Sequence, residues 1–129
     1  TNGSVIGPYA SPKVRLPGAG GAAMILPTAR RVVLWRTQHT PRVFVERLDF
    51  VSAVGNLDRV VTPLAVLRRM DGQLMIESVH PWSSEAEVRA QTGFALSTSK
   101  ASMTAPPSDE ELAALERVDG ARVRDLEFA

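Results

Sequence analysis

The chain has 129 residues, a formal net charge of +1, 44% hydrophobic residues and 22% charged residues, which fits one globular domain. Its positive charges are nearly all arginine and alternate with acids, so it lacks the clustered basic surface of a nucleic-acid-binding protein. The absence of cysteine excludes disulfides, a thiolate nucleophile and a cysteine-bound zinc ion. No run approaches the roughly 20 apolar residues that span a bilayer, so we expect a cytoplasmic protein without a membrane partner.

The first half of the chain predicts short elements. After a turn-rich lead-in, residues 13–16 alternate in polarity and predict a short strand. Residues 22–26 suit one or two helical turns, which Pro27 limits. Residues 32–35 form a continuous apolar run, typical of a strand that is covered on both faces. A further strand is expected at residues 48–51.

The second half begins with a predicted hairpin. Residues 59–67 predict one strand, in which Pro63 indicates an edge or a bulge. Asp71 and Gly72 form a strong hairpin turn signal, and residues 73–79 are the returning strand. A helix then follows: Ser84 and Glu87 have the spacing of a capping box, and Gly93 is its expected C-cap.

The C-terminal third divides into a last strand, a linker and a helix. Residues 94–96 predict a short strand that ends the main domain, which covers residues 1–96. Residues 97–107 are polar and contain proline, and predict a linker. In residues 108–129, Ser108 and Glu111 predict a second capping box, whose helix ends at Gly120 before a charged tail. This order predicts an α/β fold with an open, mixed, largely parallel sheet and flanking helices.

The main candidate for function is the glycine-rich turn Gly18-Ala19-Gly20-Gly21, which lies between a strand and a helix. Backbone amides at such a position bind phosphates or stabilise an oxyanion. The spacing also fits a dinucleotide fingerprint ending at Ala23, with Arg36 where an NADP-binding arginine would lie, although Pro27 leaves too short a helix. A Walker loop is excluded, because no Lys-Ser or Lys-Thr follows. The remaining alternative from spacing alone is a tight turn without a ligand.

A resemblance adds to these alternatives. Several blocks in order are similar to the β subunits of family I CoA-transferases, of the 3-oxoadipate and glutaconate type. The similar blocks are residues 1–7, 12–21, 41–52 with its Leu-Asp-Phe motif, 60–62, the Val-His-Pro of 79–81, and 90–96. They cover nearly all of residues 1–96.

The resemblance implies an open α/β subunit that acts with an α-type partner and moves CoA from an acyl-CoA to a carboxylic acid. The family's nucleophile is a glutamate that attacks the thioester, forms an acyl-glutamyl anhydride and then carries CoA as a glutamyl thioester. We expect Gly18, Ala19, Gly20, Gly21 and Arg15 to bind the substrate or CoA, and no separate cofactor or metal, since CoA is part of the substrate.

The catalytic glutamate is expected outside this chain. In the family it precedes the segment that resembles residues 1–7, and Glu46, Glu77, Glu85 and Glu87 do not match its motif. The chain is therefore expected to be a C-terminal portion that is inactive alone and needs the N-terminal half of the β-type subunit as well as the α-type subunit. Alternatives are a CoA-thioester hydrolase relative or a non-catalytic interaction module.

For several other residues, a functional interpretation competes with a simpler structural one. His39 and His80 are expected to be structural, because no triad partner accompanies them. Thr1 would be a nucleophile only as a processed N-terminus, and its match to the family segment favours a cleavage or truncation boundary. Trp82 stands where the family commonly has glycine. This departure is also compatible with a divergent or non-catalytic relative of the family. The acyl group is not specified by these residues.

Overall fold

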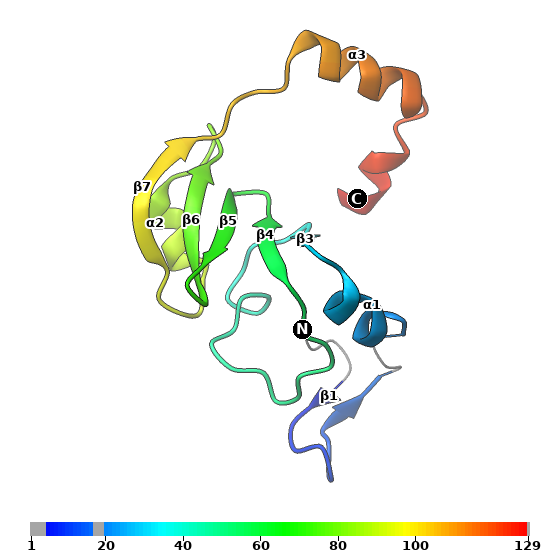
Figure 1. Cartoon of the computed structure of the whole chain (residues 1–129), viewed down its shortest axis with the longest axis vertical. Helices are drawn as coiled ribbons and strands as arrows, with labels where there is room; N and C mark the ends of the chain where they lie inside the picture. The colour runs from blue at the N-terminus through cyan, green and yellow to red at the C-terminus, as the bar shows by residue number, and fades with distance from the viewer. Residues whose placement is uncertain (1–4, 17–19, 129) are drawn as a thin grey trace.

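The computed structural model describes residues 5–16 and 20–128, and shows a mixed α/β fold (Figure 1). The strands of a small two-stranded sheet are β1 (Val5–Ile6) and β2 (Val14–Arg15). The strands of the main sheet are β3 (Val32–Trp35), β4 (Leu57–Val61), β5 (Ala65–Met70), β6 (Gln73–Val79) and β7 (Ser97–Met103). The helices are α1 (Ala22–Thr28), α2 (Glu85–Ala90), α3 (Asp109–Val118) and the 3-10 helix η1 (Val123–Phe128).

The main sheet has the strand order β3-β4-β5-β6-β7. Strand β3 pairs in parallel with β4, β4 and β6 are each antiparallel to β5, and β6 pairs in parallel with β7. Four of the five strands described in this sheet therefore run in one direction, and only β5 opposes them. The expected open, mixed and largely parallel sheet is confirmed.

The core lies between the sheet and α2. Its buried side chains come from alternate positions on the strands, because successive strand residues point to opposite faces. Helix α2 lies against β6 and β7 in Figure 1 and contributes Val88, which is fully buried. The buried cluster consists of Phe44, Val60, Ala65, Leu67, Ile76, Val88 and Leu96.

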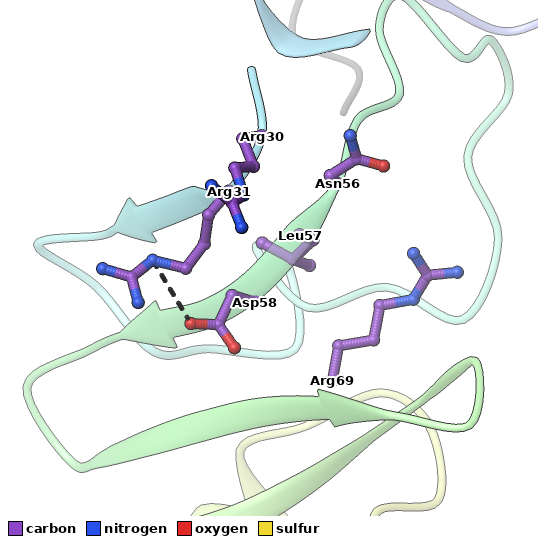
Figure 2. Close-up of a pocket in the computed structure, with 6 residues that line it drawn as sticks. All are labelled: Arg30, Arg31, Asn56, Leu57, Asp58 and Arg69. Carbon is purple, nitrogen blue, oxygen red and sulfur yellow. Dashed lines mark ion pairs between the residues drawn. The ribbon is translucent and has the colours of Figure 1, made fainter. Parts of the chain in front are cut away.

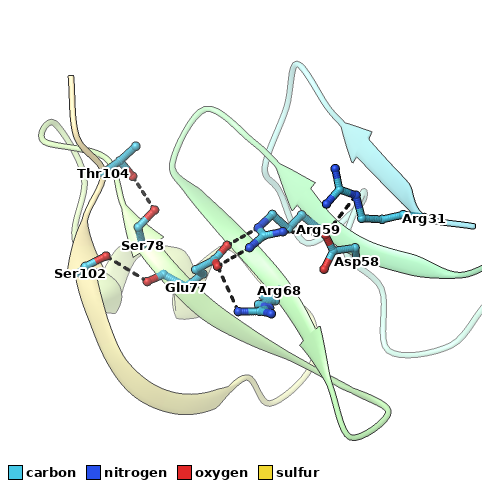
Figure 3. A network of polar contacts seen from close by, with 8 residues as sticks. All are labelled: Arg31, Asp58, Arg59, Arg68, Glu77, Ser78, Ser102 and Thr104. Carbon is cyan, nitrogen blue, oxygen red and sulfur yellow. Dashed lines mark hydrogen bonds and ion pairs between the residues drawn. The ribbon is translucent and has the colours of Figure 1, made fainter. Parts of the chain in front are cut away.

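The opposite face of the sheet carries an ionic network (Figure 3). Arg59 on β4 binds Glu77 on β6 through two bonds, Nε to Oε2 at 2.7 Å and Nη2 to Oε1 at 2.8 Å. Arg68 on the intervening strand lies 3.6 Å from the same carboxylate. This bidentate pairing lowers the pKa of Glu77, chiefly through its hydrogen bonds with Arg59. The network therefore ties three adjacent strands together.

Two strand predictions in the middle of the chain are wrong. Residues 48–51 form no strand, because Asp49 and Phe50 bind the β1–β2 hairpin instead. Residues 59–67 form parts of two strands, β4 and β5, which reverse direction at Thr62–Leu64. The Thr62 hydroxyl accepts the amide of Ala65 at 3.1 Å and stabilises that reversal. The predicted turn at Asp71 and Gly72 and the returning strand 73–79 are confirmed.

The predicted linker at residues 97–107 is also wrong over its first part. Residues 97–103 form β7 at the edge of the sheet, whereas the expected strand at 94–96 is absent. Helix α2 ends at Ala90, and its C-cap is Gln91 and not the predicted Gly93. Only half of its capping box forms, since the Ser84 hydroxyl accepts the Glu87 amide at 3.2 Å. The second capping box, Ser108 with Glu111, is complete.

Helix α3 follows an extended segment and stands away from the sheet in Figure 1. It buries none of its residues, and Leu112, Leu115 and Val118 on it are exposed. In the part of the chain that the structure describes, no helix has both the length and the apolar character needed to cross a bilayer. An amphipathic helix with an open apolar side is typical of a surface that another chain or segment covers.

Candidate functional site

The glycine-rich turn lies between β2 and α1, at the end of the small β1–β2 sheet. The two strands pair antiparallel, with Val5 opposite Arg15 and Ile6 opposite Val14. The Lys13 amide donates to the Ile6 carbonyl at 2.9 Å and closes the hairpin. Leu16 is the last described residue before Gly20.

Two residues of the Leu-Asp-Phe motif hold the hairpin in place. The Gly7 amide donates to Asp49 Oδ2 at 2.8 Å. The Tyr9 ring stacks on Phe50 with ring centroids 4.8 Å apart. Sequence reasoning assigned this motif to a strand and missed its role. The signal was present in the motif itself, since aspartate favours backbone amides in turns over places in a strand.

Arg15, a predicted binding residue, is exposed and already engaged within the hairpin. Its Nη2 donates to the Tyr9 carbonyl at 2.5 Å. Its guanidinium carbon also lies 4.5 Å from the centroid of the Tyr9 ring, in a cation–π arrangement. Tyr9 therefore links Arg15 to Phe50, and these contacts support a positioning role for Arg15 beside the turn.

Of the four predicted turn residues, Gly20 and Gly21 are described, whereas Gly18 and Ala19 lie outside the described residues. Gly20 has a φ of +57°, and a Cβ there would meet nothing within 4 Å. Glycine is thus favoured by the backbone conformation, and the space beside it is open. The amides of Gly21, Ala22 and Ala23 donate to no described residue, so they are available at the start of α1.

The two histidines are structural, as expected. Buried His39 lies 2.9 Å from the hydroxyls of both Thr62 and Thr92, and stacks on Phe44. Burial lowers its pKa. His80 Nε2 lies 2.8 Å from the Thr62 carbonyl, to which it donates. These bonds leave neither ring free to act as a general base.

Three of the four glutamates weighed against the family's motif have structural partners as well. Glu77 belongs to the ionic network, and Glu85 pairs with Arg89 in α2 at 3.7 Å. Glu87 accepts from the Ser83 hydroxyl at 3.1 Å. Among the described residues, no group of three or more histidine, cysteine or acidic side chains is placed to hold a metal ion.

Comparison with known proteins gives a consistent result. The family model described as coenzyme A transferase matches residues 1–89. The β subunit of the 3-oxoadipate CoA-transferase of Pseudomonas knackmussii is 32% identical over 137 residues, which covers 92% of this chain and 52% of the relative. The chain thus spans about half the length of the curated relatives it matches.

Two solved structures share its fold over nearly all of its length. The IpdAB protein of Rhodococcus jostii superposes with a TM-score of 0.87 at 29% identity, covering 99% of this chain and 58% of the other. The decarboxylase AibA/AibB gives a TM-score of 0.88 at 27% identity, covering 100% of this chain and 55% of the other.

Proposed function

Because this chain belongs to the coenzyme A transferase family, we propose that it forms the C-terminal portion of a β-type subunit in a heteromeric CoA-transferase. The enzyme would move CoA from an acyl-CoA to a carboxylic acid of the 3-oxo or dicarboxylic class. The observation that carries this proposal is the match to the β subunit of a 3-oxoadipate CoA-transferase over 92% of the chain. The cytoplasmic location and the absence of a separate cofactor stay predictions.

The glycine turn is the part of the site that this chain would supply. Attack on a thioester carbonyl places negative charge on its oxygen, and preorganised amides stabilise that charge. The free amides at Gly21, Ala22 and Ala23 and the open side of Gly20 fit this role. The nucleophilic glutamate would come from the N-terminal half of the same subunit, so the chain alone is expected to be inactive.

The proposed partners are that N-terminal half and an α-type subunit. Among the described residues, β3 and α3 are two of the elements that carry exposed apolar side chains. Val33 and Trp35 on the edge strand β3 are 51% and 55% exposed. Leu112 and Val118 on α3 are 47% and 87% exposed. Exposed apolar groups on an edge strand and on an unpacked helix are typical of contacts between subunits.

The test uses a matched pair of glycine variants in the assembled enzyme, which contains the complete β-type subunit and the α-type subunit. Gly20 and Gly72 both have positive φ, +57° and +82°, and a Cβ at either would meet nothing within 4 Å. Gly20→Ala and Gly72→Ala therefore carry a similar conformational strain. We expect Gly20→Ala to lower kcat for CoA transfer about tenfold or more, because displaced amides stabilise the oxyanion less well. Equal kcat values for the two variants would contradict the role of the turn.

A further inference from the structure

A hollow of about 670 Å³ lies at the end of the main sheet where β3 and β4 begin and β5 ends (Figure 2). Arg30 and Arg31 reach it from the segment before β3, and Arg69 reaches it from β5. The remaining lining residues are Asn56, Leu57 and Asp58. Three arginines from two separate segments thus line one hollow.

The positive charges of the arginines that line this hollow are not all neutralised by nearby acidic side chains. Arg30 and Arg69 have no ion-pair partner among the described residues. Arg31 lies 3.8 Å from Asp58, and its side chain is 72% exposed. Asp58 in turn is held by Arg59 at 2.6 Å. The lining therefore carries a net positive charge that an anion would neutralise.

The backbone on which these arginines stand is fixed. Asn56 Nδ2 donates to the Ala29 carbonyl at 2.9 Å, and the Val32 amide donates to the Asn56 carbonyl at 2.8 Å. These two bonds clamp the Arg30–Arg31 segment against the start of β4. A single guanidinium can bind two phosphate oxygens through parallel hydrogen bonds, so phosphate is a suitable ligand for this lining.

The surface next to the arginine-lined hollow is mostly apolar. An adjoining hollow of about 250 Å³ shares Leu57 and Arg69 with it and is otherwise lined by Leu26, Val32, Leu34, Ala53, Val54 and Gly55. A ligand with a phosphate group and an apolar body fits both. The seven-residue helix α1 connects the glycine turn to Arg30. A helix of that length spans about 10 Å.

We propose that the arginine hollow binds a phosphate group attached to an apolar body. If the proposed function holds, that group is a phosphate of CoA, whose phosphates and thiol lie at opposite ends of a long pantetheine arm. The thioester would then lie near Gly20 and Gly21, before α1, and the phosphate end near Arg30, Arg31 and Arg69. This identification of the ligand rests on the proposed function, whereas the anion site itself does not.

The site is tested first on the chain itself, by calorimetric titration with inorganic pyrophosphate. We expect saturable binding that Arg30→Gln and Arg69→Gln each weaken about tenfold, which is the effect of one charge-assisted hydrogen bond. The matched control is Arg42→Gln, an exposed arginine outside the hollow, which should leave Kd unchanged. No saturable binding, or equal effects of all three variants, would overturn the anion site.

Whether the bound phosphate group belongs to CoA is tested in the assembled enzyme. We expect Arg69→Gln to raise KM for acyl-CoA about tenfold with little change in kcat, and to leave KM for an acyl-pantetheine, which has no phosphates, unchanged. Equal effects on both substrates would overturn the assignment to CoA. If the assembled enzyme has no transferase activity, the proposed function is wrong. Pyrophosphate binding by the chain would still support the anion site in that case.

Discussion

Asp49 connects the Leu-Asp-Phe motif to the β1–β2 hairpin that precedes the glycine turn, because its carboxylate accepts the Gly7 amide across 42 residues of sequence. We expect Asp49→Ala to lower the free energy of unfolding by about 1 kcal/mol, the usual net value of such a bond. It should also shift the amide resonances of Gly20 and Gly21. Exposed Glu46, from the same block, gives the control variant Glu46→Ala, which should change neither. Unchanged glycine resonances in Asp49→Ala would contradict the positioning role.

His39 joins the β3–β4 connection to the rest of the core through two threonines. The Thr92 hydroxyl donates to the Val88 carbonyl at 2.7 Å, so it accepts from His39 Nε2. The Thr62 hydroxyl donates to the Ala65 carbonyl at 3.0 Å, and its oxygen lies 2.9 Å from His39 Nδ1. Burial of the ring disfavours its charged form and lowers its pKa from the ordinary value of 6.5.

This pKa shift predicts a pH dependence of stability. Below pH 6.5 the unfolded chain takes up a proton at His39 before the folded chain does, so stability falls as the pH decreases from 6.5. Chemical denaturation between pH 7.5 and about 5 should show this loss, and His39→Gln should remove most of the slope. If the free energy of unfolding of His39→Gln depends on pH as steeply as that of the unchanged chain, another group is responsible for the dependence.

At the scale of the elements, the sequence predicted those strands, turns and helix caps that depend mainly on neighbouring residues. The Asp71-Gly72 turn with its returning strand and the Ser108 capping box formed as expected. The apolar run 32–35 formed the predicted strand, but the expectation that it is covered on both faces is wrong, because β3 is an edge strand on which Val33 and Trp35 are exposed. The failures involve distant partners. Residues 97–103 are polar enough for a linker, yet they form β7 because β6 offers a free edge. Likewise, the contacts of Asp49 and Phe50 with the hairpin are invisible in local periodicity.

Gly93 shows such a tertiary constraint on a single glycine. Its amide donates to the Phe44 carbonyl at 2.7 Å, and a Cβ at this position would lie 2.6 Å from that oxygen. We expect Gly93→Ala to lower the free energy of unfolding by about 2 kcal/mol, because backbone atoms must separate. At Gly21 a Cβ would meet only the end of Ile25 at 3.4 Å, so Gly21→Ala is the control with little expected change. Equal melting temperatures for the two variants would refute this packing argument.

The ionic network gives a prediction for the sheet as a whole. Glu77 and Arg59 are both about one-third exposed, so solvent screening limits the expected cost of Glu77→Gln to about 1 kcal/mol. Because the pKa of Glu77 is lowered, its contribution is present above pH 4.5 and is lost as the pH falls further. Acid titration of stability should therefore be less steep in Glu77→Gln than in Glu46→Gln. Parallel curves for these variants would show that the network adds nothing.

At the scale of the whole molecule, the fold, the family and the site rest on different observations. The fold class follows from element order, and the family follows from ordered blocks of sequence that the family model also matches. The site does not follow from either. Gly18 and Ala19 lie outside the described residues, the nucleophile is expected elsewhere, and the arginine hollow draws on two segments that no local pattern connects.

The relatives also show why one measurement on the assembled enzyme matters most. Among proteins with this fold are a CoA-transferase and a decarboxylase, so shape alone does not select the reaction. The measurement is the product balance when the enzyme receives an acyl-CoA and an acceptor such as 3-oxoadipate or glutaconate. Our account predicts that a new CoA thioester of the acceptor forms in amounts equal to the donor consumed. Release of free CoA without a new thioester, or loss of carbon dioxide instead, would contradict it.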